Sequence, residues 1–195
     1  MVDRPAAETI SKDIERVVVP RERIARRVEE LASQIAGCYG GEELTILAVL
    51  TGSLIFLADL IRQLPIMMRL NVVSVCSYPG QATASQGPQF DLPVPADLAG
   101  RNVLVLDDIL DSGRTLKALL DAVAAMCPAS LRTCVLLKKD RPDLPDRPQP
   151  DFAGFQVPNE FLVGYGLDFD NLYRNLPDVC VLRRHAPGPA GETRP

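Results

Sequence analysis

Short apolar runs alternate along this chain with segments in which apolar residues recur at helical spacing, and this alternation constrains the fold most strongly. The expected strands are residues 44–50, 67–78, 101–108 and 131–137, and the expected helices are residues 20–37, 54–64 and a segment that starts at residue 114. Because parallel strands need crossover connections, this order predicts an α/β fold with a mostly parallel, twisted sheet flanked by helices. Ligands of such sheets bind at the carboxyl ends of the strands.

The first expected helix, PRERIARRVEELASQIAG, has a clear amphipathic pattern. Pro20 suits its first turn and Gly37 suits its end. The residues expected on its apolar face are Ile24, Val28, Leu31 and Ile35. The corresponding residues of the helix that starts at residue 114 are Leu116, Leu119, Leu120, Val123 and Met126.

Length and composition favour a globular protein. The chain has 195 residues, which suits one domain over 1–195, with residues from about 184 to 195 expected to form a disordered tail. Apolar residues make up 47% and charged residues 24% of the chain, as in globular proteins generally. The net charge of −4 argues against a nucleic-acid partner, because binding to a phosphate backbone needs a clustered excess of Lys and Arg.

The cysteines and the apolar runs predict a cytoplasmic protein. The chain has 5 scattered cysteines without C-x-x-C spacing, which favours reduced thiols in the core. The uncharged run over residues 44–58 is interrupted by TGS and is shorter than the roughly 20 apolar residues of a membrane span. We therefore expect neither secretion nor a membrane partner.

Two connections differ from the rest of the chain in composition. PGQATASQGPQFDLP, residues 79–93, is long and has no periodicity, and loops of this kind often serve as lids or binding loops. DRPDLPDRPQP, residues 140–150, is rich in Pro and Asp and precedes a series of short apolar pieces. Residues 79–93 are therefore a candidate lid.

The stretch VLVLDDILDSGRT places carboxylates where a buried strand should end. Asp107, Asp108 and Asp111 lie close to Ser112 and Gly113, at the point where the strand gives way to a helix. A glycine allows close approach of a ligand, and the first-turn N–H groups of a helix suit an anion. A phosphate beside several carboxylates would be repelled unless the ligand also brings hydroxyls and a cation. A phosphorylated sugar with bound Mg²⁺ meets both requirements.

Other interpretations of this stretch are weaker. The two adjacent acids could form only a polar strand end, with Ser112 capping the helix, but uncompensated charge at a strand end is costly. A P-loop is excluded because G-x-x-x-x-G-K-[ST] is absent. A receiver-type aspartate site would normally have its acid pair at the start of the domain, whereas this pair is mid-chain.

VLVLDDILDSGRTL resembles the 5-phosphoribosyl-1-pyrophosphate (PRPP) motif of type I phosphoribosyltransferases. Its context is similar to the hypoxanthine-guanine phosphoribosyltransferases, through AVLTGSLIFLADLI, SVCSYPG, VLLKK and PDFAGFQVPNEFLVGYGLDFDNLYRNLPDVCVL. The likeness extends from about residue 44 to residue 182. It implies a type I phosphoribosyltransferase fold with a small hood and a mobile loop, and an enzyme that uses Mg²⁺.

The resemblance assigns the PRPP motif residue by residue. Asp107 and Asp108 would hold the ribose hydroxyls, in part through Mg²⁺, and Asp111 would lie by N7 of the purine as the proton carrier. The residues that would bind the 5-phosphate are Ser112, Gly113, Arg114 and Thr115.

The pyrophosphate would lie against TGS, which is Thr51, Gly52 and Ser53, and against Arg174. Some relatives carry Lys or Arg at the position of Thr51, so any charge from that side chain is lost here. Ser77 and Tyr78 match the Ser-Tyr pair of the mobile loop. Taken alone, TGS would be interpreted as an ordinary turn.

For the purine, the resemblance implies Lys139 at the exocyclic oxygen, with Lys138 as the alternative. Phe161 would stack on the base and Leu162 would present a backbone group to its edge. Asp168, in the same region, matches a carboxylate that binds a second Mg²⁺, so the implied metal ligands are Asp107, Asp108 and Asp168. Each of these side chains alone has an ordinary interpretation as core or surface.

The function implied is transfer of the 5-phosphoribosyl group from PRPP to hypoxanthine or guanine, which yields IMP or GMP and pyrophosphate. Two alternatives remain. One is a regulator without catalytic activity that senses PRPP or purines, and the other is a phosphoribosyltransferase for xanthine or another base. Relatives are commonly homodimers or homotetramers, so self-association is also expected.

Overall fold

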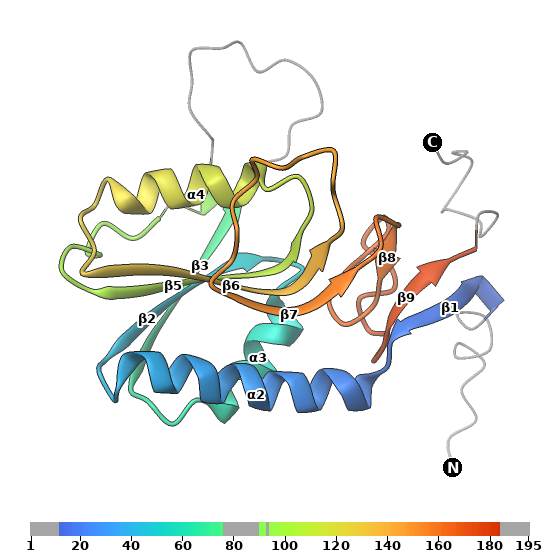
Figure 1. Ribbon diagram of the computed structural model, residues 1–195, viewed down its shortest axis with the longest axis horizontal. Coiled ribbons are helices and arrows are strands. Elements are labelled where there is room, and N and C mark those ends of the chain that lie inside the picture. The colour runs from blue at the N-terminus through green and yellow to red at the C-terminus, as the bar shows by residue number, and fades with distance from the viewer. Residues whose placement is uncertain (1–11, 76–89, 93, 184–195) are drawn as a thin grey trace, which may run out of the picture.

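The computed structural model describes residues 12–75, 90–92 and 94–183. Its main element is a six-stranded sheet with the strand order β4-β3-β2-β5-β6-β7, in which only β4 is antiparallel to its neighbour (Figure 1). The strands are β2 (Leu44–Leu50), β3 (Met68–Val75), β4 (Phe90–Leu92), β5 (Asn102–Leu110), β6 (Ser130–Lys139) and β7 (Phe152–Val157). The predicted parallel α/β sheet is therefore confirmed.

Helices cover both faces of this sheet. Helices α2 (Arg21–Tyr39) and α3 (Leu54–Gln63) pack on one face, and α4 (Arg114–Ala124) packs on the other, as Figure 1 shows. Along β2, Ile46 and Ala48 face α2 and α3, whereas Leu47 and Val49 face α4. A strand buried on both faces is nearly continuously apolar, which explains why LTILAVL, with Thr45 as its one polar residue, shows no alternation.

Helix α2 begins where expected and ends later than predicted. Pro20 is its N-cap, but the helix runs through Gly37 to Tyr39. It ends at Gly40, which has a φ of +58° and donates its backbone N–H to Ala36 O at 3.2 Å. Gly40 rather than Gly37 ends the helix, because the left-handed conformation at a helix end favours glycine.

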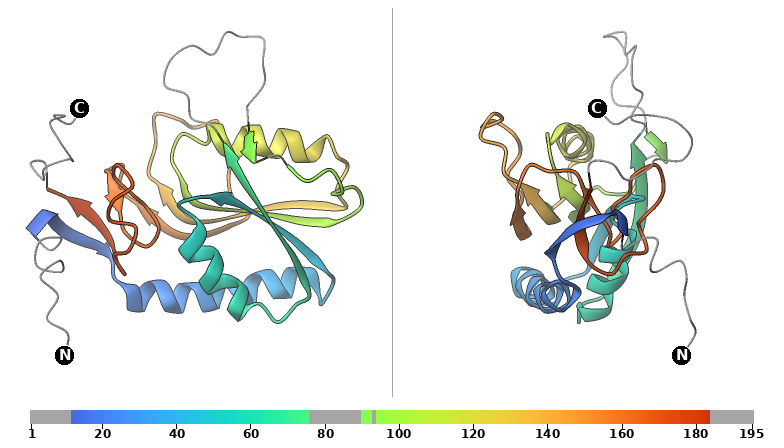
Figure 2. Two further views of the ribbon diagram at one scale, coloured as in Figure 1. Left: turned by 180° about the vertical axis from the view of Figure 1, so that it is seen from behind. Right: turned by 90° about the vertical axis from the view of Figure 1, so that its right-hand side faces the viewer.

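A second, smaller sheet lies beyond the carboxyl ends of the parallel strands, and Figure 2 shows it from two further directions. It is antiparallel, has the order β1-β9-β8, and consists of β1 (Ile14–Val19), β9 (Val179–Leu182) and β8 (Leu162–Val163). This sheet is the hood that the resemblance implied. Strand β1 was not predicted, because most of its side chains are at least partly exposed and only Val19 is buried.

The candidate lid and the mobile loop are described only in part. Residues 90–92, which were expected to belong to a loop, form β4 and pair with the end of β3, with Ser74 opposite Leu92. The rest of the candidate lid, residues 79–89 and 93, lies outside the described residues, as do Ser77, Tyr78 and the expected tail. No helix in the described ranges is long and apolar enough to cross a membrane.

The strand order changes direction between β2 and β5. From β2 the chain moves outward to β3 on one side, and it then returns to place β5, β6 and β7 on the other side. Helices that follow neighbouring strands at such a switch point lie on opposite faces, so their connecting loops diverge and leave a crevice. The loops that follow β2 and β5 are TGS and DSG, the two segments that the sequence analysis selected.

Candidate active site

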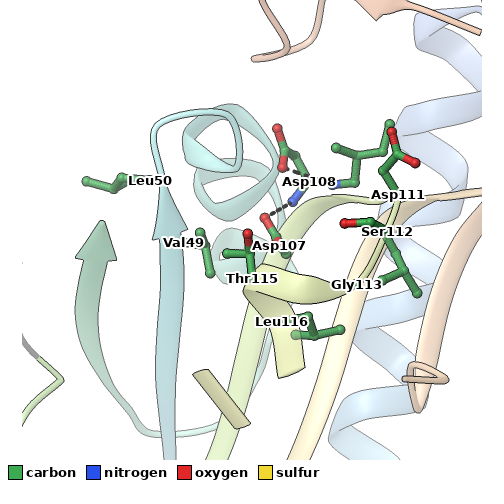
Figure 3. Close-up of a pocket in the computed structure, with 11 residues that line it drawn as sticks. Val49, Leu50, Asp107, Asp108, Asp111, Ser112, Gly113, Thr115 and Leu116 are labelled. Carbon is green, nitrogen blue, oxygen red and sulfur yellow. Dashed lines mark hydrogen bonds between the residues drawn. The ribbon is translucent and has the colours of Figure 1, made fainter. Parts of the chain in front are cut away.

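A cavity of about 240 Å³ lies at this switch point, lined by the end of β5, the start of α4 and the end of β2 (Figure 3). Most of the predicted PRPP motif lines it. The motif residues on its wall are Asp107, Asp108, Asp111, Ser112, Gly113 and Thr115, and β2 contributes Val49 and Leu50. Sequence reasoning therefore selected residues that the fold brings together around one space.

Asp107 and Asp108 are adjacent carboxylates with little access to solvent. Asp107 Oδ1 accepts a hydrogen bond of 2.9 Å from the backbone N–H of Asp108, and Asp108 Oδ1 accepts one of 2.9 Å from Ile109. Burial raises the pKa of Asp107, and the charge of Asp108 raises it further. Burial also raises the pKa of Asp108, although hydrogen bonds and the charge of Arg174 act in the opposite direction.

This acid pair fits a magnesium ion that arrives with a phosphorylated ligand. Among the residues that the structure describes, neither carboxylate forms a salt bridge with a basic side chain, so their charge is not neutralised by a direct partner. No group of three His, Cys, Asp or Glu side chains in the described part of the chain forms a metal cage. Mg²⁺ typically uses one or two carboxylates, and substrate oxygens and water supply its other ligands. Two carboxylates from the protein are therefore sufficient.

The part of the motif that was predicted to bind the 5-phosphate lies at the start of α4. The N-cap is Gly113, which has a φ of +75° and no side chain with which to satisfy the first N–H groups of the helix. Ser112 Oγ accepts only a long contact of 3.4 Å from the Arg114 N–H, so the alternative of a simple serine cap is not supported. Arg114 does not line the main cavity and instead borders a separate hollow with Lys117.

The TGS loop follows β2 beside the cavity, but none of its three residues is on the cavity wall. A Cβ atom on Gly52 would lie 1.7 Å from Asp108 Oδ2, so only glycine allows the loop and this carboxylate to occupy their positions. Ser53 is fully buried and donates its hydroxyl to Val49 O, whereas Thr51 is exposed. The Leu50–Thr51 peptide bond is cis. The loop therefore meets the cavity wall at Asp108, through the backbone of Gly52.

Asp111 lies between two basic side chains. Lys139 Nζ donates to Asp111 Oδ2 at 2.8 Å, and Arg141 Nη1 donates to Asp111 Oδ1. Partial burial alone raises the pKa of Asp111, but the ion pairs with Lys139 and Arg141 outweigh it and hold that pKa below its ordinary value. Lys138 Nζ instead donates to Gln149 at 2.6 Å. Lys139 is thus the lysine beside the predicted proton carrier.

A further group comes from the segment between β8 and β9. Arg174 forms a salt bridge of 2.8 Å with Asp168 and donates to Gly166 O at 2.7 Å. Gly166 has a φ of +99°, and a Cβ atom there would lie 2.1 Å from Gly52 O. This direct contact between two backbones brings Arg174 close to the TGS loop. Both were predicted to bind the pyrophosphate.

None of the four residues predicted to bind the purine, Lys139, Phe161, Leu162 and Asp168, is on the cavity wall. Phe161 is 55% exposed, and its ring makes an edge-to-face contact with Phe169 at 5.5 Å. Leu162 is buried in β8 and pairs with Val181 of β9. Both oxygens of Asp168 have protein partners, because Oδ2 accepts the Asn171 N–H at 2.9 Å while Oδ1 contacts Arg174.

Comparison with known proteins decides the family. The family model described as phosphoribosyl transferase domain matches residues 18–170. The chain belongs to the phosphoribosyltransferase family. The resemblance drawn from the motifs is therefore confirmed.

Individual relatives in this family have similar lengths. The hypoxanthine-guanine phosphoribosyltransferase of Lactococcus lactis is 36% identical over 176 residues, which cover 90% of this chain and 95% of the relative. The hypoxanthine-guanine-xanthine phosphoribosyltransferase of Tritrichomonas foetus is 37% identical, with 88% and 93% covered. A crystal structure of a hypoxanthine-guanine phosphoribosyltransferase from Bacillus anthracis has a TM-score of 0.79 and 37% identity, and the match covers 86% of this chain and 98% of that one.

Sequence reasoning missed three residues of this phosphoribosyltransferase site. Arg141 and Arg147 lie in the Pro/Asp-rich connection between β6 and β7, and Gly166 lies in GYGLDFD. The connection has no periodic pattern that would indicate where its side chains point. Paired glycines in GYG were a signal of close backbone approach, but the partner loop is more than a hundred residues away in the chain.

Proposed function

We propose that the protein is a purine phosphoribosyltransferase that transfers the 5-phosphoribosyl group from PRPP to hypoxanthine or guanine. The products are IMP or GMP and pyrophosphate. One observation carries the proposal: a single cavity is lined by the adjacent carboxylates of Asp107 and Asp108, by the glycine-capped start of a helix and by Asp111, which is paired with Lys139. Family membership and the names of the relatives support it.

In this proposal the sugar phosphate spans the cavity. Asp107 and Asp108 would bind the ribose hydroxyls and would hold Mg²⁺, which would supply positive charge to stabilise the pyrophosphate. The 5-phosphate accepts hydrogen bonds from first-turn N–H groups of α4 and from the hydroxyls of Ser112 and Thr115. The fit of these groups to a phosphate is supported by the glycine N-cap at Gly113.

The leaving pyrophosphate would lie between Thr51, Gly52 and Ser53 on one side and Arg174 on the other. Because Ser53 already donates its hydroxyl to Val49 O, the contribution of this loop comes from backbone N–H groups. Preorganised donors of this kind stabilise negative charge as it develops on the leaving group. Asp168, paired with Arg174 here, is assigned to the second Mg²⁺.

The purine would lie by Asp111 and Lys139. An ionised Asp111 accepts the N7 proton while another ring nitrogen of the purine attacks the anomeric carbon. The Lys139 ammonium donates to the 6-oxo group, and the amino group of adenine would instead face a donor, which selects against adenine. Phe161 is assigned to stacking on the base, Leu162 to a backbone contact with its edge, and Ser77 and Tyr78 to the mobile loop that excludes water.

Replacing Arg141 by Gln should move the acid limb of the pH profile to higher pH. Arg141 helps to keep the pKa of Asp111 low, so its loss raises that pKa, and the ionised base is then lost earlier as the pH falls. The measurement is kcat/KM for hypoxanthine against pH, which reports groups of the free enzyme. Arg141→Lys, which keeps a positive charge, should shift the limb less. An unchanged acid limb in Arg141→Gln would contradict the role of this ion pair.

A steady-state assay with hypoxanthine, guanine, xanthine and adenine, each with PRPP, tests the function. We expect Mg²⁺-dependent release of pyrophosphate with hypoxanthine or guanine and little with adenine. Omission of Mg²⁺ is the control. Failure to turn over any of the four bases would overturn the proposal.

Two alternatives are outcomes of the same assay. Tight PRPP binding without turnover of any base would favour a regulator that senses PRPP. A preference for xanthine is the second alternative, and the name of the Tritrichomonas foetus relative includes that base. The choice among the 6-oxopurines depends on backbone contacts to the 2-position, so the ranking of bases in the assay decides it.

We also propose a homodimer or homotetramer in the cytoplasm. Self-association is supported by large apolar side chains exposed on α3 and on or beside β3, namely Leu54, Ile55, Met67, Leu70 and Val72. Sedimentation velocity tests it, and a monomer would contradict it. The cytoplasmic location is supported by the four cysteines in the described ranges, all of which are free thiols. Cell fractionation tests that location.

A further inference from the structure

Arg147, in the connection between β6 and β7, bridges the ends of two strands. Its Nη1 donates to Asp111 O at 2.7 Å and lies 3.3 Å from Leu110 O, and its Nη2 donates to Lys139 O. The last paired residues of β5 and β6 are Leu110 and Lys138. The guanidinium therefore joins the two strands one residue beyond the point where their own pairing stops.

The residues held in this way are the two assigned to the purine. Asp111 and Lys139 lack a ladder partner across the β5–β6 boundary, and Arg147 supplies a fixed bridge between their backbones. A guanidinium suits this task because its donors lie in a rigid plane, whereas the donors of a lysine rotate about one nitrogen.

The same connection also lies against the phosphate-binding turn. A Cβ atom on Gly113 would lie 2.9 Å from Pro148 Cδ and 3.3 Å from Arg147 Cβ. Lys138 donates a hydrogen bond to the side chain of Gln149, two residues after Arg147. The segment 147–149 is thus held at Pro148 and Gln149, which limits how far the guanidinium can move.

We propose that Arg147 is a positioning residue that fixes the separation of Asp111 and Lys139 and so sets purine affinity and the discrimination between 6-oxo and 6-amino purines. The inference rests on the proposed function. Arg147 acts through the backbones of Asp111 and Lys139. Its loss therefore removes neither side chain, but the separation of the two backbones is no longer fixed. Misplacement of reacting groups by about 1 Å can cost roughly 10²-fold in rate.

The test compares Arg147→Met and Arg147→Lys with wild type and with Arg27→Met. Arg27 is a matched control, because it donates to Gly154 O at 3.0 Å and to Ala153 O at 2.7 Å and thus also binds two backbone carbonyls, but on β7 away from the cavity. The measurements are kcat and KM for hypoxanthine, the ratio of hypoxanthine to adenine turnover, PRPP affinity and the thermal midpoint.

In Arg147→Met we expect kcat/KM for hypoxanthine to fall by about 10- to 100-fold, the hypoxanthine-to-adenine ratio to fall, and PRPP affinity to stay within about 3-fold of wild type. Arg147→Lys should recover part of the loss. Arg27→Met should lower only the thermal midpoint. If Arg147→Met and Arg27→Met both show a similar loss of kcat/KM for hypoxanthine and of PRPP affinity, Arg147 has only a structural role and the inference is wrong. An inactive wild type would instead overturn the proposed function.

Discussion

Asp111→Asn is expected to lower kcat for hypoxanthine by about 10²- to 10⁴-fold while PRPP affinity changes little. The amide is close in size to the carboxylate but cannot accept the N7 proton. Asp111 accepts hydrogen bonds from both Lys139 and Arg141, and the single carbonyl oxygen of the asparagine can keep only one of them, because its NH₂ group cannot accept. The measurements are steady-state kcat and the dissociation constant of PRPP in the presence of Mg²⁺.

Asp143→Asn is a matched control for this variant. Asp143 binds the same guanidinium, at 2.8 Å from Arg141 Nη2, but it does not line the cavity. If activity were lost because Arg141 loses an ion pair, both Asp111→Asn and Asp143→Asn would have low activity. Activity of Asp111→Asn close to that of wild type would refute the assignment of Asp111 as proton carrier.

Gly52→Ala is expected to lower kcat/KM for PRPP by at least about 10²-fold. The added Cβ would lie 1.7 Å from Asp108 Oδ2 and 2.7 Å from Asp108 Cγ, so the carboxylate or the whole TGS loop must move. Either movement disturbs a group assigned to the ribose or to the pyrophosphate. Affinities for PRPP and for pyrophosphate, measured separately, show which of the two moves.

Gly37→Ala provides the control for this substitution. Gly37 lies within α2, and a Cβ atom there would have no neighbour within 4 Å, so the same chemical change should leave activity unchanged. Retention of full PRPP affinity in Gly52→Ala would show that the loop adapts freely. Such a result would remove the argument that only glycine fits beside Asp108.

The main sheet and the PRPP motif could be predicted because their signals are local. Strand β2 has the predicted bounds, since a strand buried on both faces is a continuous apolar run with sharp ends. The carboxylates and Gly113 are close in sequence, so their convergence needed only a strand that turns into a helix. The resemblance then supplied roles that the pattern alone did not.

The remaining features depend on contacts between distant segments. Strand β1 carries exposed charged residues and becomes a strand only by pairing with β9, more than a hundred residues later. The choice between Lys138 and Lys139 required the direction of each side chain at the end of β6. Arg141 and Arg147 lie in an aperiodic connection, so only the folded chain reveals that they reach Asp111.

Glycines form the tightest points of the cavity and of its surroundings. Side chains at Gly52, Gly113 and Gly166 would collide with Asp108, with Pro148 and with the carbonyl of Gly52 respectively. At these three positions the main chain therefore lies too close to its neighbours to carry a side chain. Engineering the protein for a bulkier nucleobase or sugar would require loops of different length, because exchanges of side chains at these three positions could only make the space smaller.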